Sequence, residues 1–195
     1  MSKITVVFHS GSGHTLRLAQ AVARGARSVE DAEVRLVPVA EVEQRWSELD
    51  DADALVFGAP TYMGSASAAF KSFMDSTGGR WMQQSWKDKL AAGFTNSGSP
   101  AGDKLATLQQ FATFAMQHGM LWVGLGLLPG AMLEDREQNR FGTFLGATAQ
   151  SPHGAPESEA PPAGDLRTGE ALGRRVALAA RRWTTREARP EPAHA

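Results

Sequence analysis

The stretch ITVVFHSGSGHT (residues 4–15) decides the fold of this chain, because it holds a strand, a turn and the start of a helix in succession. Its first five residues form a β-branched apolar run, which is typical of a buried strand. A turn of serines and glycines follows, and beyond Thr15 the residues Leu18, Ala19 and Val22 recur at helical spacing. The stretch therefore predicts a strand that leads through a short loop into an amphipathic helix.

Further apolar runs alternate with helical patterns along the chain. We expect the other strands at residues 34–37, 55–58, 90–94 and 120–125. Such alternation predicts a parallel sheet that is covered by helices on both faces. The predicted fold class is α/β, with a doubly wound five-stranded parallel sheet in the strand order 2-1-3-4-5. In this order, ligands bind at the carboxyl ends of the first and third strands.

The length of 195 residues favours one domain, which we expect over residues 1–188. Ten of the 36 residues from 129 to 164 are Gly or Pro, and this composition predicts an irregular insertion. A last helix should begin near Asp165, after the insertion. Residues 189–195 are predicted to form a flexible tail.

Composition excludes several classes of function. The chain has no cysteine, so it forms no disulfide, thiol nucleophile, Cys-based zinc site or thiolate-bound iron–sulfur cluster. Its formal net charge of −1 argues against a nucleic-acid partner. No apolar run approaches the length that spans a bilayer, and the amino terminus lacks the layout of a signal peptide. We therefore expect a cytoplasmic protein without a membrane partner.

Three loops that follow predicted strands share a composition. They are the segments HSGSGHT (residues 9–15), APTYMGS (59–65) and TNSGSPAG (95–102). All three are rich in glycine and hydroxyl side chains, and none contains Lys, Arg, Asp or Glu. Because the carboxyl ends of parallel strands meet at one edge of a sheet, we expect the three loops to converge there.

The first loop predicts a phosphate site built from neutral donors. A strand-to-helix turn directs backbone N–H groups and the positive end of a helix toward an anion. Ser10, Ser12 and Thr15 add hydroxyl donors, while Gly11 and Gly13 allow close approach of the backbone. The loop lacks the lysine of a Walker loop, and the chain lacks the cysteine of a low-molecular-weight phosphatase. The other two loops suit the walls around a flat heteroaromatic ring.

Five segments carry a resemblance to a known family. Ser10–Thr15 fits the S/T-x-S/T-G-x-T phosphate loop of flavodoxins. Pro60–Gly64 and Phe73–Trp81 resemble the P-T-x-x-G and F-x-D-x-T-G-G-x-W motifs of the WrbA-type NAD(P)H:quinone oxidoreductases. Asn96–Ser99 and His118–Met120 resemble the S-T-G-T and H-G-M segments of the same enzymes. In these motifs the chain is similar to the flavodoxin-like superfamily, which also includes the NAD(P)H-dependent FMN reductases.

The resemblance implies a flavodoxin-like fold, bound FMN and the two-electron reduction of quinone-like acceptors by NADH or NADPH. It also implies that Trp81 and His118 act in catalysis, by lining the place where nicotinamide or quinone stacks. No metal site is expected, because His9 and His14 have no third ligand nearby. The predicted FMN-binding residues are Ser10, Gly11, Ser12, Gly13, His14 and Thr15 at the phosphate, and Pro60, Thr61, Tyr62, Met63, Gly64, Asn96, Ser97, Gly98, Ser99 and Gly102 in the two other loops.

Departures from the family pattern keep two alternatives open. Tyr62-Met63 stands where the family usually has Arg-Phe, and Pro100-Ala101 replaces two glycines. One alternative is a flavodoxin-type FMN electron carrier, although such carriers are strongly acidic around the flavin. The other is a flavodoxin-like regulatory protein without catalytic activity. The apolar side chains of residues 127–145 are too many for a free loop, so we expect a homo-oligomer, either a dimer or a tetramer.

Overall fold

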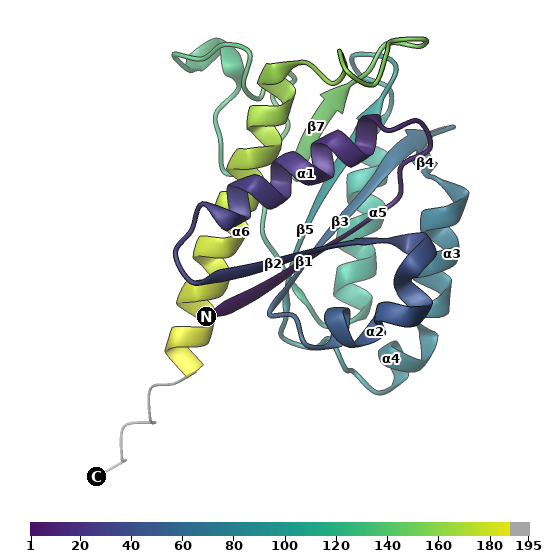
Figure 1. The fold of residues 1–195 in the computed structure, drawn as a ribbon, viewed down its shortest axis with the longest axis vertical. Helices are drawn as coiled ribbons and strands as arrows, with labels where there is room; N and C mark the ends of the chain where they lie inside the picture. The colour runs from purple at the N-terminus through teal and green to yellow at the C-terminus, as the bar shows by residue number, and fades with distance from the viewer. Residues whose placement is uncertain (188–195) are drawn as a thin grey trace.

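The computed structural model describes residues 1–187, with side chains to residue 184, so the predicted tail at 189–195 lies outside the described residues. The described part alternates strands and helices from end to end (Figure 1). The elements are β1 (Ser2–Phe8), α1 (His14–Arg27), β2 (Ala32–Pro38), the 3₁₀ helix η1 (Val39–Glu41), α2 (Val42–Asp50), β3 (Ala54–Tyr62), β4 (Ser65–Ala66), α3 (Ala68–Ser76), α4 (Gly78–Met82), β5 (Leu90–Ser97), α5 (Lys104–Gln117), β6 (Leu121–Trp122), the 3₁₀ helix η2 (Gly130–Met132), β7 (Ala147–Gln150) and α6 (Ala163–Glu187).

The sheet has the predicted topology. Its strands follow the order β2-β1-β3-β5-β6, and all four of these pairings are parallel. This order corresponds to the predicted 2-1-3-4-5, because β4 is only a two-residue strand that pairs antiparallel with the end of β3. Helices cover both faces of the sheet (Figure 1). The doubly wound, flavodoxin-like α/β fold is thus confirmed.

The fifth strand differs from the prediction. Only Leu121 and Trp122 of the expected strand at 120–125 pair with β5, opposite Leu90 and Ala91. Beyond Val123 the chain leaves the sheet, and it returns as β7, which pairs with the carboxyl-terminal half of β5 at Phe94–Ser97. Two short strands, β6 and β7, therefore share the position of the expected fifth strand, and residues 123–146 connect them. The expectation of irregular structure throughout 129–164 is wrong in this respect, because β7 lies inside that range.

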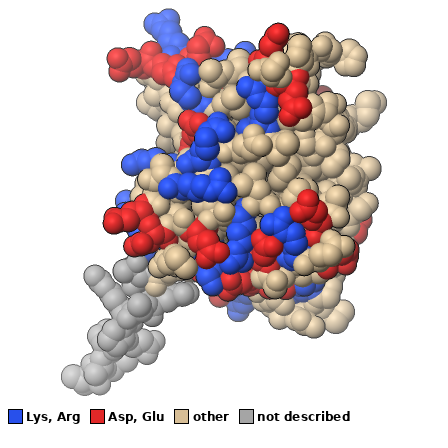
Figure 2. Space-filling view, viewed as in Figure 1, with Lys and Arg blue, Asp and Glu red and all other residues tan. Residues whose placement is uncertain are grey.

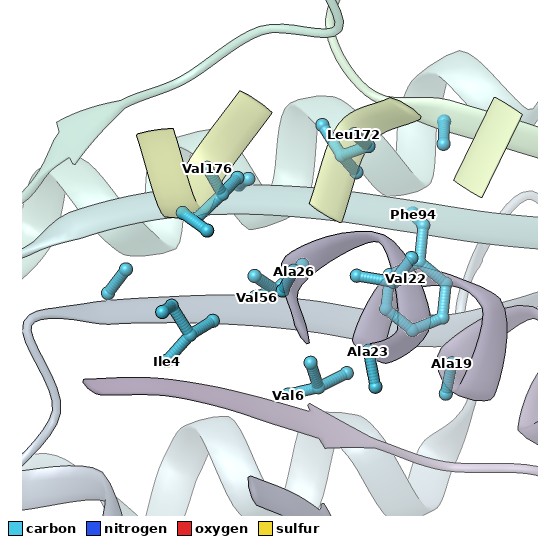
Figure 3. Close-up of a cluster of buried hydrophobic side chains, with 14 of the residues drawn as sticks. Ile4, Val6, Ala19, Val22, Ala23, Ala26, Val56, Phe94, Leu172 and Val176 are labelled. Carbon is cyan, nitrogen blue, oxygen red and sulfur yellow. The ribbon is translucent and has the colours of Figure 1, made fainter. Parts of the chain in front are cut away.

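Successive residues of the central strands point to two separate cores. On one face, Val6 of β1 and Val56 of β3 pack under α1 and α6, as the close-up in Figure 3 shows. On the other face, Phe57 packs with aromatic side chains of α3 and α5. Within residues 1–187 there is no helix of sufficient length and apolarity to span a membrane.

Two glycines let α1 and α6 approach each other very closely. A Cβ atom built on Gly173 of α6 would lie 1.9 Å from the carbonyl oxygen of Val22, and one built on Gly25 of α1 would lie 1.8 Å from that of Glu170. Real Cβ contacts are never so short, so only glycine fits at both positions. The contact matters for the site, because the amino end of α1 follows the serine–glycine loop.

Candidate functional site

The predicted loops converge at the carboxyl end of the sheet, where they surround a cavity of about 520 Å³. This volume lies in the range of roughly 300–1,000 Å³ that small-molecule and cofactor sites occupy. The segment after β7 closes the cavity as a fourth wall. The lining residues are Gly11, Ser12, His14 and Thr15 from the first loop, Pro60 and Tyr62 from the second, Asn96, Ser97 and Gly98 from the third, and Ser151, Pro152, His153, Gly154 and Ala155 from the fourth wall.

The first loop turns sharply into α1. Gly13 adopts φ +82°, which favours glycine, and the Oγ of Ser10 accepts a hydrogen bond of 3.1 Å from the N–H of Leu16. The first intrahelical bond runs from Arg17 N–H to the carbonyl of Gly13, so the N–H groups of His14 and Thr15 have no acceptor within the helix. Ser10 and Gly13 do not line the cavity; they set the geometry of the turn that does.

The second loop brings an aromatic ring to the cavity and ends in a tight hairpin. The hydroxyl oxygen of Tyr62 lies so close to Gly11 that a Cβ atom there would be 2.6 Å from it. Met63 and Gly64 adopt φ values of +49° and +75° between the paired strands β3 and β4, as a two-residue hairpin turn requires. The Met63 side chain is completely exposed. These two residues shape the loop but do not line the cavity.

Thr61 has a structural place beneath the cavity. Its hydroxyl lies 2.8 Å from the hydroxyls of both Thr95 and Thr107, and Thr95 also donates to the carbonyl of Ala59. All three threonines are buried. Buried hydroxyls that satisfy one another make a polar network rigid. The network ties the ends of β3 and β5 to α5, below the loops that they carry.

The third loop is held from below by a buried lysine. Lys104 is 3% exposed, and its ammonium group donates to the Oγ of Ser97 and to the carbonyls of Ser99 and Pro100 at 3.0, 2.9 and 2.7 Å. Burial lowers the pKa of Lys104 to about 8. Gly102 has φ +53°, and a Cβ atom there would lie 2.1 Å from Ser97 Oγ. Ser99 and Gly102 thus act on the shape of the loop and do not line the cavity.

Sequence reasoning missed the fourth wall, residues 151–155. Ser151 is joined to the third loop by two hydrogen bonds, from its N–H to the carbonyl of Ser97 at 3.0 Å and from its hydroxyl to Asn96 Oδ1 at 3.2 Å. His14 Nε2 lies 3.0 Å from the carbonyl oxygen of Ala155, and so connects this wall to the first loop. The wall follows directly from β7, whose pairing beside β5 carries the chain to the carboxyl edge of the sheet.

Comparisons with known proteins identify the family. The model of the NADPH-dependent FMN reductase family matches residues 3–129. The chain belongs to this family. It is therefore a flavin-dependent oxidoreductase with FMN as cofactor and NAD(P)H as reductant, as its motifs predicted.

Individual relatives agree with this assignment. The chain is 45% identical over 181 residues to flavodoxin FldP of Pseudomonas aeruginosa, an alignment that covers 91% of this chain and 96% of that protein. It is 36% identical over 199 residues to an NAD(P)H dehydrogenase (quinone) of Archaeoglobus fulgidus, with the same coverage. Among solved structures, a WrbA-like flavodoxin from Agrobacterium tumefaciens is 41% identical and superposes with a TM-score of 0.75 over 93% of this chain and 99% of that one.

The cavity fits the chemical groups of FMN. Neutral hydroxyl and N–H donors at the amino end of α1 suit a phosphate, because the positive end of a helix favours an anion. Gly11 leaves the backbone open to close approach where a side chain would collide with Tyr62. The amide of Asn96 and the ring of Tyr62 can meet the polar edge and the face of an isoalloxazine ring. The lining therefore fits FMN with its phosphate at the first loop and its ring in the space between the second and third loops.

Trp81 and His118 lie far from this cavity within one chain. His118 follows α5, a helix of 14 residues and thus about 20 Å long, whose first residue is at the third loop. Its ring is 1% exposed, packs against Trp86, and has Nε2 3.0 Å from Thr77 Oγ1; burial lowers its pKa. Trp81 is on α4, at the opposite end of the sheet from β4 and β7 (Figure 1). The catalytic role of both residues stays a prediction that no contact within one chain supports.

Glu157 adds a negative charge beside the phosphate loop. A Cβ atom on Gly13 would lie 2.2–2.5 Å from the carboxyl atoms of Glu157, so the carboxyl group packs directly against this glycine. Arg17 donates to the backbone carbonyls of Glu157 and Ala160, and not to the carboxylate. The carboxylate should repel the phosphate of FMN.

We expect Glu157→Gln to lower the Kd for FMN by about threefold at low ionic strength, because glutamine keeps the size of the side chain and removes its charge. Quenching of flavin fluorescence on addition of apoprotein measures this Kd. The effect should decline as salt is added. An unchanged or higher Kd in the variant would show that the carboxylate does not act on the phosphate.

Proposed function

We propose that this protein catalyses the FMN-dependent two-electron reduction of quinone-like acceptors by NADH or NADPH. The observation that carries the proposal is the chemistry of the cavity wall, which holds Tyr62 and no Lys, Arg, Asp or Glu among its lining residues. An uncharged planar quinone can enter such a site without the loss of a hydrated charge. The name of the Archaeoglobus relative, NAD(P)H dehydrogenase (quinone), supports the same reaction.

Bound FMN would supply the two-electron redox chemistry of this reaction, while the residues of the cavity bind and orient the flavin and the substrates. The first loop holds the phosphate through neutral donors. The buried threonines beneath Pro60 and Asn96 keep two walls of the cavity fixed relative to each other. Tyr62 is half exposed at the second loop, so its ring can stack on a flat substrate or on the flavin.

The second candidate is an FMN electron carrier, which the 45% identity to flavodoxin FldP favours. The charge distribution argues for the enzyme instead. In Figure 2 charged side chains lie at the top of the molecule, across its middle and along its lower edge, and basic and acidic groups are mixed in each place. A carrier that docks basic redox proteins needs an acidic rim around its flavin. The lining residues of this cavity include no Asp or Glu, and Glu157 beside Gly13 is a single carboxylate in a surface of mixed charge.

Steady-state turnover separates the two candidates. FMN-loaded protein should oxidise NADH or NADPH with benzoquinone at a rate on the order of 10 s⁻¹, a typical enzymatic value. Apoprotein without added FMN is the control, and it should show no activity. If the loaded protein does not turn over with either nucleotide, yet passes electrons from a reductase to an acceptor protein, the carrier is correct.

We also propose that the chain forms a homo-oligomer, either a dimer or a tetramer. Leu128, Met132 and Phe144 of the insertion are 53%, 69% and 57% exposed, and Leu105 of α5 is 55% exposed beside Phe144 in an apolar groove. Exposed apolar patches of this kind mark interaction sites. Light scattering at micromolar concentration measures the assembly, and a monomer would contradict the proposal.

A further inference from the structure

Lys104 is a buried cation with an unusual set of partners. All three hydrogen bonds of its ammonium group go to neutral oxygens of the third loop, on Ser97, Ser99 and Pro100. The ammonium nitrogen also lies 4.7 Å from the ring centroid of Phe141. Within residues 1–184, no carboxylate lies within 4.0 Å of it. The charge of Lys104 is therefore buried without a counter-ion.

The one carboxylate that acts on Lys104 is already neutralised. Asp165 is 1% exposed and accepts two hydrogen bonds from the guanidinium of Arg140, at 2.7 and 3.0 Å. Arg140 in turn lies 4.1 Å above the same Phe141 ring. The charged groups that face Lys104 are thus one carboxylate and one guanidinium, so the cluster of three carries a net charge of +1.

This positive charge lies directly behind the wall of the cavity. Ser97 and Gly98 line the cavity, and Ser97 Oγ is the acceptor of the 3.0 Å bond from Lys104. The lining residues include no Lys, Arg, Asp or Glu. Lys104 is therefore the charged group that lies behind the third loop, on the side away from the cavity. Low-dielectric surroundings strengthen its field, because water does not screen a buried group.

The burial of an unpaired ammonium group is costly, and the lowered pKa of Lys104 reflects that cost. A buried charge beside a cavity, with a pKa that burial has shifted, is typical of a functional site. A bound flavin gains negative charge on reduction, which is the change that a fixed cation can stabilise.

We propose that Lys104 is a positioning residue with an electrostatic role: it orders the Ser97–Pro100 loop and stabilises reduced FMN relative to oxidised FMN. The inference rests on FMN binding in the cavity, and it does not depend on which acceptor the enzyme reduces. A purely structural role would weaken the binding of both redox forms equally. The proposed role requires that the loss of Lys104 weakens the binding of reduced FMN more than the binding of oxidised FMN.

The test compares Lys104→Met with Lys104→Arg at pH 7, and uses Lys87→Met as a matched control because Lys87 is exposed. Flavin fluorescence quenching gives the Kd of oxidised FMN, and the midpoint potential of bound FMN against a reference dye then gives the Kd of the reduced form. Lys104→Met should raise the reduced-form Kd about tenfold more than the oxidised-form Kd, and so shift the potential to more negative values. Lys104→Arg should keep the potential near that of the parent, as should Lys87→Met.

Equal changes of the two Kd values in Lys104→Met, or an unchanged potential, would overturn the proposal. If circular dichroism shows that Lys104→Met does not fold, Lys104→Gln replaces it, because glutamine can still donate to the Ser99 and Pro100 carbonyls. Both readouts require only FMN and a reductant dye. A failure of quinone turnover would therefore leave this test unaffected.

Discussion

Gly173→Ala should lower the free energy of unfolding by about 3 kcal/mol, because the new methyl group would meet the backbone of α1 and not a movable side chain. The added Cβ would lie 1.9 Å from the carbonyl oxygen of Val22 and 3.0 Å from the nitrogen of Ala26. The two helices must therefore separate, and the loss outweighs the roughly 1 kcal/mol that alanine gains over glycine in a helix. Urea unfolding of the apoprotein, followed by circular dichroism, measures the change.

The same substitution should also weaken FMN binding, because a displaced α1 carries the phosphate loop with it. Gly79→Ala is the matched control: Gly79 is helical, and nothing lies within 4 Å of a Cβ atom built on it. That variant should be as stable as the parent or slightly more stable. If Gly173→Ala behaves like Gly79→Ala, then the close approach of α1 and α6 is not a requirement of the fold.

Asp165→Ala should cost about 3 kcal/mol of stability and raise the Kd for FMN. The carboxylate is 1% exposed, binds the guanidinium of Arg140 through both oxygens, and accepts a third hydrogen bond of 2.8 Å from the N–H of Gln150. Its loss leaves the guanidinium of Arg140, whose side chain is 28% exposed, without a carboxylate partner, and only the 3.3 Å bond to Gln150 Oε1 and the contact with the Phe141 ring remain. It also releases the end of β7, which leads directly into the cavity wall at Ser151.

Asp135→Ala is the control for Asp165→Ala. Asp135 also accepts two hydrogen bonds from an arginine, Arg167, but both side chains are exposed, at 39% and 43%. Exposed ion pairs contribute little, so this variant should unfold at the same urea concentration as the parent. Equal losses of stability in the two variants would mean that burial does not determine how much the Asp165–Arg140 pair stabilises the fold.

Much of the fold and of the site could be predicted from local sequence. Strands β1, β3 and β5 have short apolar runs that are bounded by turn residues, and their order follows from the rules for parallel sheets. The three uncharged loops were expected to converge, and they do, because the carboxyl ends of parallel strands share an edge. Among the predicted residues that line the cavity are Ser12, Tyr62 and Asn96.

The parts that the sequence does not reveal depend on contacts between distant segments. β7 reads Ala-Thr-Ala-Gln, a four-residue segment with no large apolar residue, and it pairs with β5. Its signal is therefore too weak to be read as a strand, and the wall at 151–155 was missed with it. Lys104 opens a helix and resembles any surface lysine in sequence. Only the fold shows that the third loop and Phe141 bury it.

The predicted catalytic role of Trp81 and His118 is a different case. Their motifs match the family, yet a motif specifies neighbours in sequence and not the distance to a cavity. The structure shows that α5 separates His118 from the third loop by the whole length of the helix. A test of a catalytic role for Trp81 or His118 therefore has to be separate from the tests of the residues that line the cavity of the same chain.

The most direct test of the central claim follows the flavin itself through both half-reactions, without oxygen. The account predicts that one equivalent of NADH or NADPH bleaches the visible absorbance of the bound FMN, and that one equivalent of benzoquinone then restores it. Both steps should be fast enough to support the steady-state rate. If NAD(P)H leaves the absorbance unchanged, or if quinone fails to restore it, then the protein is not an FMN-dependent NAD(P)H:quinone oxidoreductase.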